Sequence, residues 1–303
     1  MELLFYPLDL DYEIREEGQA IYLYGKTTDG RQVCVVDFFQ PYFYVEVDPQ
    51  RDVRALLNQI EVRQGETVYR VVGVEEVEKK IVNQKKIFYK VFAPIPKAVP
   101  LLKEQAVALG LQCYEYDILF VYRYLIDKQI VPMTLVKAEG DFVEEKRRVP
   151  TFIAEKVVPL GGETLNEVKM LALDIETYAK EKIVDMEKNP ILMIALYGYY
   201  RGKELKKVIT WKKFSTDSLD IEFVESERAL LERCREVIYH YQPDILTGYY
   251  SDGFDLPYLS TRARKYGLTF DLGWDYSSLV VGQKESKITG LVHVDIFKFV
   301  RTI

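Results

Sequence analysis

Two carboxylates separated by one residue are the first feature of this chain that suggests chemistry. Asp174 and Glu176 end the apolar stretch 168–173, which only Lys169 interrupts. Such a stretch predicts a buried strand, and side chains alternate between the faces of a strand, so both carboxylates should point the same way. Like charges held side by side repel unless a cation neutralises them, and carboxylate oxygens suit Mg²⁺ or Mn²⁺. Alone, an Asp-x-Glu pair is more often a solvated strand end.

A second acidic position follows another apolar segment, residues 244–249, which we predict to be a strand. The sequence Thr-Gly-Tyr-Tyr-Ser-Asp-Gly-Phe-Asp-Leu-Pro-Tyr over 247–258 then opens a predicted helix. Asp255 stands near the start of that helix, where free N–H groups and the helix dipole favour negative charge. Pro257 fits the first turn, because its missing N–H has no partner there to lose. By itself, Asp255 is explained equally well as a helix cap.

Taken together, the strand-borne Asp-x-Glu pair and the helix-opening Phe254-Asp255 pair resemble the first two acidic motifs of the ribonuclease-H-like 3′–5′ exonuclease domain of DNA polymerases. The resemblance extends along the whole chain to the amino-terminal part of an archaeal-type family B DNA polymerase. Further matching stretches lie at 115–120, 123–128, 208–211, 226–228 and 293–295. This ordered series spans two domains, which makes the match a specific one.

The length of 303 residues, with 48% hydrophobic and 29% charged residues, describes an ordinary globular chain with room for about two domains. We predict a mixed α+β amino-terminal domain over residues 1–136. By resemblance, an α/β, ribonuclease-H-like 3′–5′ exonuclease domain follows over residues 137–303. The junction is placed in the polar segment 137–167.

Local signals predict the elements of both domains. Segments 20–25 and 32–39 flank Thr-Thr-Asp-Gly at 27–30, which predicts a hairpin. Further strands are expected at 42–47, 87–92, 168–173, 191–200, 206–211, 244–249 and 288–296, and helices at 99–109, 119–128, 226–241 and 255–266.

Composition narrows the possible partners and cofactors. The net charge of -6 argues against a broad surface that coats nucleic acid, although DNA held in a local groove is compatible with it. With only His240 and His293, a zinc hydrolase is disfavoured. The three cysteines, Cys34, Cys113 and Cys234, show no paired spacing and are expected in the core.

For the exonuclease site, the resemblance implies that Asp174, Glu176 and Asp255 are catalytic residues and metal ligands. The complete site would use two Mg²⁺ or Mn²⁺ ions to hydrolyse phosphodiester bonds. Phe254 would pack beneath the site or near the primer end, and the surroundings of Thr177 would touch the terminal nucleotide of the DNA.

Two departures from the family bear on activity. Tyr250 stands where the family usually has Asn, four positions before Phe254, which affects substrate positioning more than metal binding. The third family motif, Tyr-x-x-x-Asp, should follow the segment after Asp295 and is not found before Ile303. The site is therefore expected to lack a carboxylate, and we predict little or no exonuclease activity for this chain alone.

The resemblance also implies a pocket in the first domain that captures uracil in the template strand ahead of synthesis. A tight apolar wall would exclude the methyl group of thymine, which is worth about 1–3 kcal/mol, and the base must leave the stack to be read. Leu119 stands where Pro is common, which implies lower selectivity. The matching positions are Tyr12, Pro41, Tyr42, Pro96, Val99, Pro100, Asp117, Ile118, Phe120 and Arg123.

Three functional hypotheses follow. The first is a fragment of a DNA-directed DNA polymerase whose parent performs replication and repair synthesis. Its partners would be single-stranded and primer–template DNA, the polymerase domains missing from this chain and, through the parent, a sliding clamp. It would act in the cytoplasm at the nucleoid, without a membrane. The second is a free-standing ribonuclease-H-like nuclease that completes its site with Asp295 or Asp252. The third is a non-catalytic subunit that binds single-stranded DNA.

Overall fold

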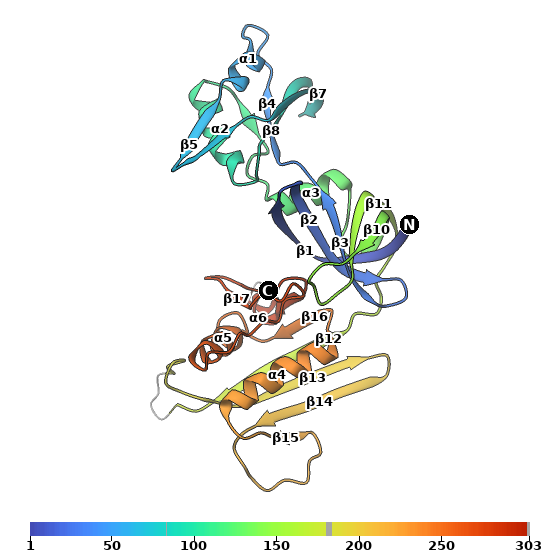
Figure 1. Cartoon of the computed structure of the whole chain (residues 1–303), viewed down its shortest axis with the longest axis vertical. Coiled ribbons are helices and arrows are strands. Elements are labelled where there is room, and N and C mark those ends of the chain that lie inside the picture. The colour runs from blue at the N-terminus through green and yellow to red at the C-terminus, as the bar shows by residue number, and fades with distance from the viewer. Residues whose placement is uncertain (83, 180–183, 302–303) are drawn as a thin grey trace. The chain divides into compact units, whose positions relative to one another are not determined.

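The computed structural model describes residues 1–82, 84–179 and 184–301, which form two compact units (Figure 1). Unit 1 comprises Met1–Asp11, Leu23–Val35 and Val131–Ile303, and unit 2 comprises Tyr12–Tyr22 and Val36–Ile130. The first strands of the chain therefore contribute residues to both units. The mixed α+β architecture predicted from the sequence is confirmed.

Unit 1 contains a six-stranded sheet with the strand order β15-β14-β13-β12-β16-β19. The central strand β12 pairs antiparallel with β13 and parallel with β16, which in turn pairs parallel with β19. Parallel pairing places the carboxyl ends of β12, β16 and β19 at the same edge of the sheet. The strands are β12 (Met170–Thr177), β13 (Ile191–Tyr200), β14 (Lys203–Thr210), β15 (Ile221–Phe223), β16 (Ile245–Gly248) and β19 (Val292–Asp295).

Two helices, α4 (Glu227–Tyr241) and α5 (Asp255–Lys265), pack against one face of this sheet. Figure 1 shows α4 lying along β13 and β14, which it also contacts. The buried stripe of α4 is the expected one, and its residues share a core with the odd-numbered residues of β12. That core includes Leu230, Leu231, Cys234, Val237, Ile238, Leu171, Leu173 and Ile175. Burial of this apolar area is what fixes the two helices on the sheet.

The segment 137–167, which we expected to be a polar junction, instead forms most of two long paired strands. Strands β1 (Glu2–Arg15), β10 (Thr134–Val143), β11 (Thr151–Thr164), β3 (Gln32–Phe38) and β2 (Gly18–Thr27) close into a barrel in that order. The segment is polar on average, and this hid the alternating pattern of a half-buried strand. In β10, Val136 and Ala138 are buried between more exposed neighbours. At Gly140, φ is +158° and a Cβ atom would lie 2.0 Å from the Ile153 carbonyl oxygen, so the close pairing requires glycine.

Unit 2 is built on a four-stranded sheet with the order β7-β8-β4-β9 and a separate hairpin, β5-β6. Its elements are β4 (Tyr42–Glu46), α1 (Val53–Asn58), β5 (Glu61–Gln64), β6 (Thr67–Arg70), β7 (Gly73–Ile81), β8 (Gln84–Phe92), α2 (Ala98–Ala108), β9 (Cys113–Tyr114) and α3 (Phe120–Lys128). Helix α2 packs its residues Ala98, Val99 and Leu102 on the core that contains Phe43 and Val91.

Most expected elements agree with the structure apart from small shifts at their ends, but the strand predicted over 288–296 is wrong in its first half. Ile288 and Leu291 form a single bridge around Gly290, whose φ is +79°. The strand β19 begins only at Val292, and helix α6 (Ile296–Val300) follows it directly. The remaining short strands are β17 (Val280–Val281) and β18 (Ser286–Lys287). Among the described residues, no helix has the length and apolar character needed to cross a bilayer.

Candidate functional site

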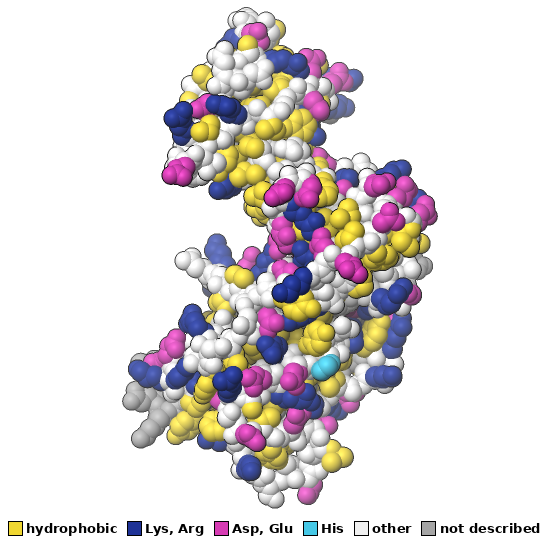
Figure 2. Space-filling view, in the orientation of Figure 1, with side chains coloured by type: hydrophobic (Ala, Val, Ile, Leu, Met, Phe, Trp, Pro, Cys, Tyr) yellow, Lys and Arg dark blue, Asp and Glu magenta, His cyan; other side chains and the backbone are white. Residues whose placement is uncertain are grey.

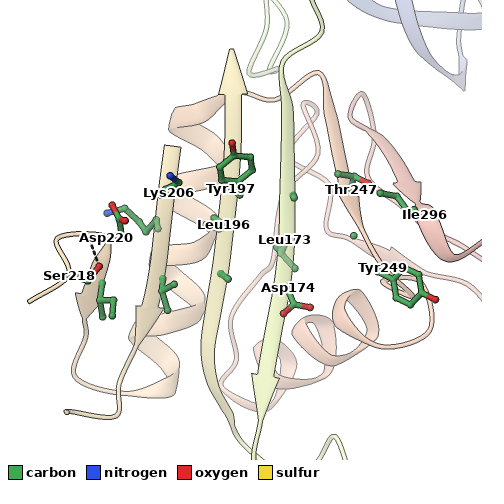
Figure 3. A pocket seen from close by; sticks show the side chains of 16 residues that line it. Leu173, Asp174, Leu196, Tyr197, Lys206, Ser218, Asp220, Thr247, Tyr249 and Ile296 are labelled. Atoms are coloured by element: carbon green, nitrogen blue, oxygen red, sulfur yellow. Dashed lines mark hydrogen bonds between the residues drawn. The ribbon is translucent and has the colours of Figure 1, made fainter. Parts of the chain in front are cut away.

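The Asp-x-Glu pair lies on the face of β12 opposite the helices, and its two side chains share that face as strand alternation predicted. Asp174 and Glu176 are exposed, whereas Leu173 and Ile175 are buried beneath α4 and α5. Figure 3 shows Asp174 on β12, between the strand that carries Tyr197 and the segment that carries Tyr249. The apolar residues of β12 therefore anchor the strand while the two carboxylates remain available at its end.

Asp255 joins this strand from the start of α5. Its Oδ1 atom accepts a hydrogen bond of 3.0 Å from the backbone N–H of Ile175, the residue between Asp174 and Glu176. The side chain is 2% exposed, and Phe254 rather than Asp255 occupies the N-cap position. Asp255 is thus not the helix cap that the sequence alone allowed. Its carboxylate reaches across to the neighbouring strand.

The electrostatic setting of Asp255 is unfavourable for its charged form. Burial raises the pKa of Asp255 from 3.8 to about 6; the Ile175 N–H opposes this shift, and the negative charges of Asp174 and Asp295 reinforce it. Repulsion among carboxylates of this kind is relieved by a bound cation. Among the described residues, the groups that set the pKa of Asp255 are backbone N–H donors and two other aspartates, and none of them is a cation.

The donor chemistry at this end of β12 fits a hard divalent cation, because all the donors are carboxylate oxygens. Asp174 is close enough to Asp255 for its charge to raise the pKa of Asp255, and Glu176 shares the exposed face of Asp174. Within residues 1–82, 84–179 and 184–301, no group of three His, Cys, Asp or Glu side chains is arranged to hold a metal ion. The described residues thus fit one part of a metal site rather than a closed set of ligands.

Two further aspartates, which the sequence offered as substitutes for the missing carboxylate, already hold the backbone. Asp295 accepts N–H groups from Tyr250 at 2.8 Å, Phe297 at 3.0 Å and Asp252 at 3.1 Å. Asp252 pairs with Lys298 at 2.5 Å. Burial would raise the pKa of Asp252, but Lys298 and a backbone N–H lower it overall. Both carboxylates therefore fix the turn that precedes α5.

Tyr250, Phe254 and Thr177, which were predicted to contact DNA, have three different environments. Tyr250 is 49% exposed, has a left-handed φ of 60°, and places its ring edge-to-face with Phe297 at 5.1 Å. Phe254 is partly buried and packs against the core that contains α4 and α5. Thr177 is half-buried at the end of β12. The aromatic contact to Phe297 was not predicted, since 47 residues separate it from Tyr250 in the sequence.

A cavity of about 570 Å³ extends from Asp174 over the exposed face of the sheet (Figure 3). Its floor is mainly apolar, and Lys206, Lys207 and Asp220 stand at the side of β14. The other lining residues are Ala172, Leu173, Ala195, Leu196, Tyr197, Val208, Ser218, Ile221, Thr247, Gly248, Tyr249 and Ile296. On the face shown in Figure 2, acidic and basic side chains are interspersed.

In unit 2, part of the predicted uracil pocket forms a connected aromatic and ionic cluster. Tyr12 contacts Phe120 edge-to-face at 5.2 Å, and Phe39, which the sequence analysis missed, contacts both Phe120 and Tyr42. The Tyr42 hydroxyl donates to Asp127 at 2.6 Å. Burial, followed by this bond to Asp127, raises the pKa of Tyr42 above its usual range.

Other members of that predicted set have different environments. Arg123 is 5% exposed and is held by Glu115 at 2.6 Å, so it supports the cluster from within. Val99 is 7% exposed and belongs to a different core cluster from that of Tyr42. Pro41 is buried, Pro96 and Ile118 are half-buried, and Pro100 and Asp117 are exposed.

Comparison with known proteins places these observations in a family. The sequence model described as DNA polymerase family B, exonuclease domain, matches residues 111–302. A DNA polymerase of Pyrococcus glycovorans is 34% identical over 97% of this chain, and one of Methanocaldococcus jannaschii is 31% identical over 98%. The family B DNA polymerase of Pyrobaculum calidifontis, a solved structure, superimposes with a TM-score of 0.81 at 27% identity over 99% of this chain. The chain spans 34%, 17% and 37% of these proteins, respectively.

Proposed function

Because the chain belongs to DNA polymerase family B and contains the exonuclease domain of that family, we propose that it forms the template-sensing and 3′–5′ proofreading part of a DNA-directed DNA polymerase. The observation that carries the proposal is the hydrogen bond from the Ile175 N–H to Asp255, which brings a helix-borne carboxylate to the strand of Asp174 and Glu176. The substrates would be single-stranded 3′ ends and primer–template DNA, at the nucleoid in the cytoplasm. The partners would be the polymerase domains and, through them, a sliding clamp.

In this proposal Asp174, Glu176 and Asp255 hold Mg²⁺ or Mn²⁺, which when bound supplies activation of water and stabilisation of the leaving 3′ oxygen. The protein groups do three things. The buried strand β12 fixes the spacing of the first two carboxylates. The Ile175 N–H orients Asp255, and the exposed ring of Tyr250 offers a stacking surface for a terminal base. We also propose that the template-sensing domain covers residues 1–136 and the exonuclease domain residues 137–303.

The first test measures metal binding and nuclease activity together in the 303-residue chain. We expect Mn²⁺ to bind, and Asp174→Asn and Asp255→Asn each to weaken binding about tenfold or more. Asp217→Asn, in an exposed loop, is the matched control and should leave binding unchanged. Binding that none of these variants alters would contradict the proposed site.

Activity separates the polymerase fragment from a free-standing nuclease. Because Asp174, Glu176 and Asp255 are not arranged as a closed group of metal ligands in the described residues, we expect almost no degradation of 3′-labelled single-stranded DNA with Mg²⁺ or Mn²⁺. Degradation by the pure chain that Asp174→Ala abolishes would favour the free-standing nuclease. DNA binding that is independent of metal and unaffected by Asp174→Ala would favour a non-catalytic binding subunit.

A second proposed function, reading of uracil in single-stranded DNA, is supported by the aromatic cluster of Tyr12, Phe39 and Phe120. We expect binding of a uracil-containing strand over its thymine counterpart by tenfold, or roughly 1.4 kcal/mol, at a fixed salt concentration. Tyr12→Ala should remove the preference, and Tyr122→Ala, an equally drastic change at a residue 57% exposed, should not. Substitution of Val99 is unsuitable because its side chain is buried in a core.

A further inference from the structure

The turn between β16 and α5 determines where Asp255 begins its helix. Ser251 lies in this turn, is 2% exposed, and accepts the N–H of Leu256 with its backbone carbonyl at 3.0 Å. Tyr250 accepts N–H groups from Gly253 and Phe254, both at 3.0 Å. The backbone carbonyls of Tyr250 and Ser251 thus hold the start of α5 through hydrogen bonds. A movement of either residue would therefore also move Asp255.

Tyr250 does not adopt its conformation by intrinsic preference. Its φ of 60° lies in the left-handed region, which is unfavourable for a non-glycine residue. Surrounding groups must hold such a residue in place. The Asp295 carboxylate does so on one side, by accepting the backbone N–H groups of Tyr250 and Asp252.

On the other side, a buried histidine bridges two side chains of the turn. The Nε2 atom of His293 lies 2.9 Å from the Ser251 hydroxyl, and its Nδ1 atom lies 3.4 Å from Oδ1 of Asp252. The side chains of His293 and Asp252 are 4% and 7% exposed. A neutral imidazole with its proton on Nδ1 satisfies both contacts, since Ser251 then donates to Nε2 and Nδ1–H points to the carboxylate.

The charged neighbours complete this arrangement. Lys298 of α6 neutralises Asp252 from the opposite side of the carboxylate, at 2.5 Å. Burial lowers the pKa of His293 and the Lys298 charge acts in the same direction, whereas Asp252, Asp295 and a hydrogen bond to the Ser286 backbone oppose the shift. The ring is therefore favoured in the neutral form, which presents one donor and one acceptor.

We propose that His293 is a positioning residue for Asp255: by bridging Ser251 and Asp252, it locks the turn that sets the first turn of α5 and hence the carboxylate beside Asp174. This role rests on the proposed function, in which Asp255 is a metal ligand, but it concerns only contacts within this chain. The bridge spans 42 residues in the sequence between Ser251 and His293. It ties the end of β16 to β19 at the edge of the sheet where Asp174 and Glu176 emerge.

The test is the hydrogen-exchange rate of the Ile175 amide in the metal-free chain, because that N–H donates to Asp255. His293→Leu removes both contacts and should accelerate exchange about tenfold. Ser251→Ala removes only the hydroxyl and should give an increase in the same direction. His293→Gln, which keeps a donor and an acceptor, should restore most of the protection.

Thr210→Val is the matched control for general destabilisation. Thr210 is fully buried in the same sheet, and its hydroxyl donates to the Leu192 carbonyl at 2.9 Å. This variant should lower the free energy of unfolding and leave Ile175 exchange where it was. Equal Ile175 exchange in wild type, His293→Leu and Ser251→Ala, with all three folded, would overturn the proposal.

Mn²⁺ binding separates failure of this inference from failure of the proposed function. Faster Ile175 exchange in His293→Leu supports the positioning role even if wild type shows no Asp174-dependent binding, in which case only the metal site is refuted. If wild type does bind, His293→Leu should weaken binding about tenfold and His293→Gln much less. Binding and exchange both unchanged in His293→Leu would refute the positioning role alone.

Discussion

Two buried carboxylates begin neighbouring helices in the same unit, and their pKa values are shifted in opposite directions. Glu227 starts α4 and Asp255 starts α5. Each accepts a backbone N–H from a strand of the sheet, Glu227 from Ile191 at 2.9 Å and Asp255 from Ile175 at 3.0 Å. By sequence position and burial alone, the two residues are equivalent.

Their other partners distinguish them. Arg262 donates to the two carboxylate oxygens of Glu227, from Nε at 2.7 Å and from Nη2 at 2.5 Å, and the Tyr266 hydroxyl donates to Glu227 at 2.8 Å. Burial would raise the pKa of Glu227, but Arg262, the Ile191 N–H and Tyr266 together lower it. For Asp255, burial raises the pKa to about 6, and the charges that add to this shift, those of Asp174 and Asp295, are negative.

This contrast distinguishes Glu227, a carboxylate with a structural role, from Asp255, a carboxylate suited to bind a cation. Glu227 is neutralised within the protein, so its charge strengthens the packing of α4 against α5. Among the described residues, the charges that shift the pKa of Asp255 include no cation that would compensate its own charge. Perturbed carboxylates of this kind gather at functional sites, because a bound cation or proton supplies the missing compensation.

The largest expected effect comes from breaking the structural pair. Arg262→Met leaves the Glu227 charge buried and unpaired, so we expect the free energy of unfolding to fall by about 3–5 kcal/mol. Urea denaturation followed by circular dichroism measures the change. Arg264→Met, which removes an arginine whose side chain is 74% exposed on the same helix, should cost less than about 0.5 kcal/mol. Equal losses in the two variants would show that burial of the pair has no energetic consequence.

Neutralising each carboxylate should change stability in opposite directions. Glu227→Gln breaks the pair with Arg262 and should destabilise the protein by about 3 kcal/mol. Asp255→Asn keeps an oxygen for the Ile175 N–H and removes an unfavourable charge, so it should stabilise the metal-free chain at pH 8 by on the order of 2 kcal/mol. The same denaturation experiment at pH 8 compares both variants. A loss of stability in Asp255→Asn would place Asp255 in the same class as Glu227.

The pH dependence of stability should contain the same contrast. The folded-state pKa of Asp255 is raised from 3.8 to about 6, so its contribution is fully present below pH 3.8 and is lost as the pH rises through about 6. Asp9, whose pKa burial also raises to about 6, adds a loss over the same range. Asp255→Asn and Asp9→Asn should each remove part of the slope, as thermal unfolding at several pH values would reveal. Mn²⁺ should flatten only the Asp255 part; flattening that persists in Asp255→Asn would contradict the metal site.

The sequence was sufficient to predict β12, α4, α5 and the shared direction of Asp174 and Glu176, because each depends on a local apolar period. It was insufficient for contacts between distant segments. Asp255 and Ile175 are 80 residues apart, and no local pattern records which strand a helix start will meet. The barrel hairpin β10-β11 was missed for a related reason, since its burial comes from barrel closure rather than from an apolar run.

The smallest expected effect concerns how the two helices begin. The Ser226 hydroxyl caps α4 by accepting the Ala229 N–H at 3.2 Å, whereas Phe254 at the start of α5 provides no side-chain cap. Ser226→Ala should therefore cost about 1 kcal/mol of unfolding free energy. Ser215→Ala, in an exposed loop, should have almost no effect. A measurable loss confined to Ser226→Ala would mean that α4 is fixed by its own capping and ion pair. The start of α5 depends instead on the turn beneath Asp255, which leaves the position of that carboxylate to the contacts of Asp295 and His293.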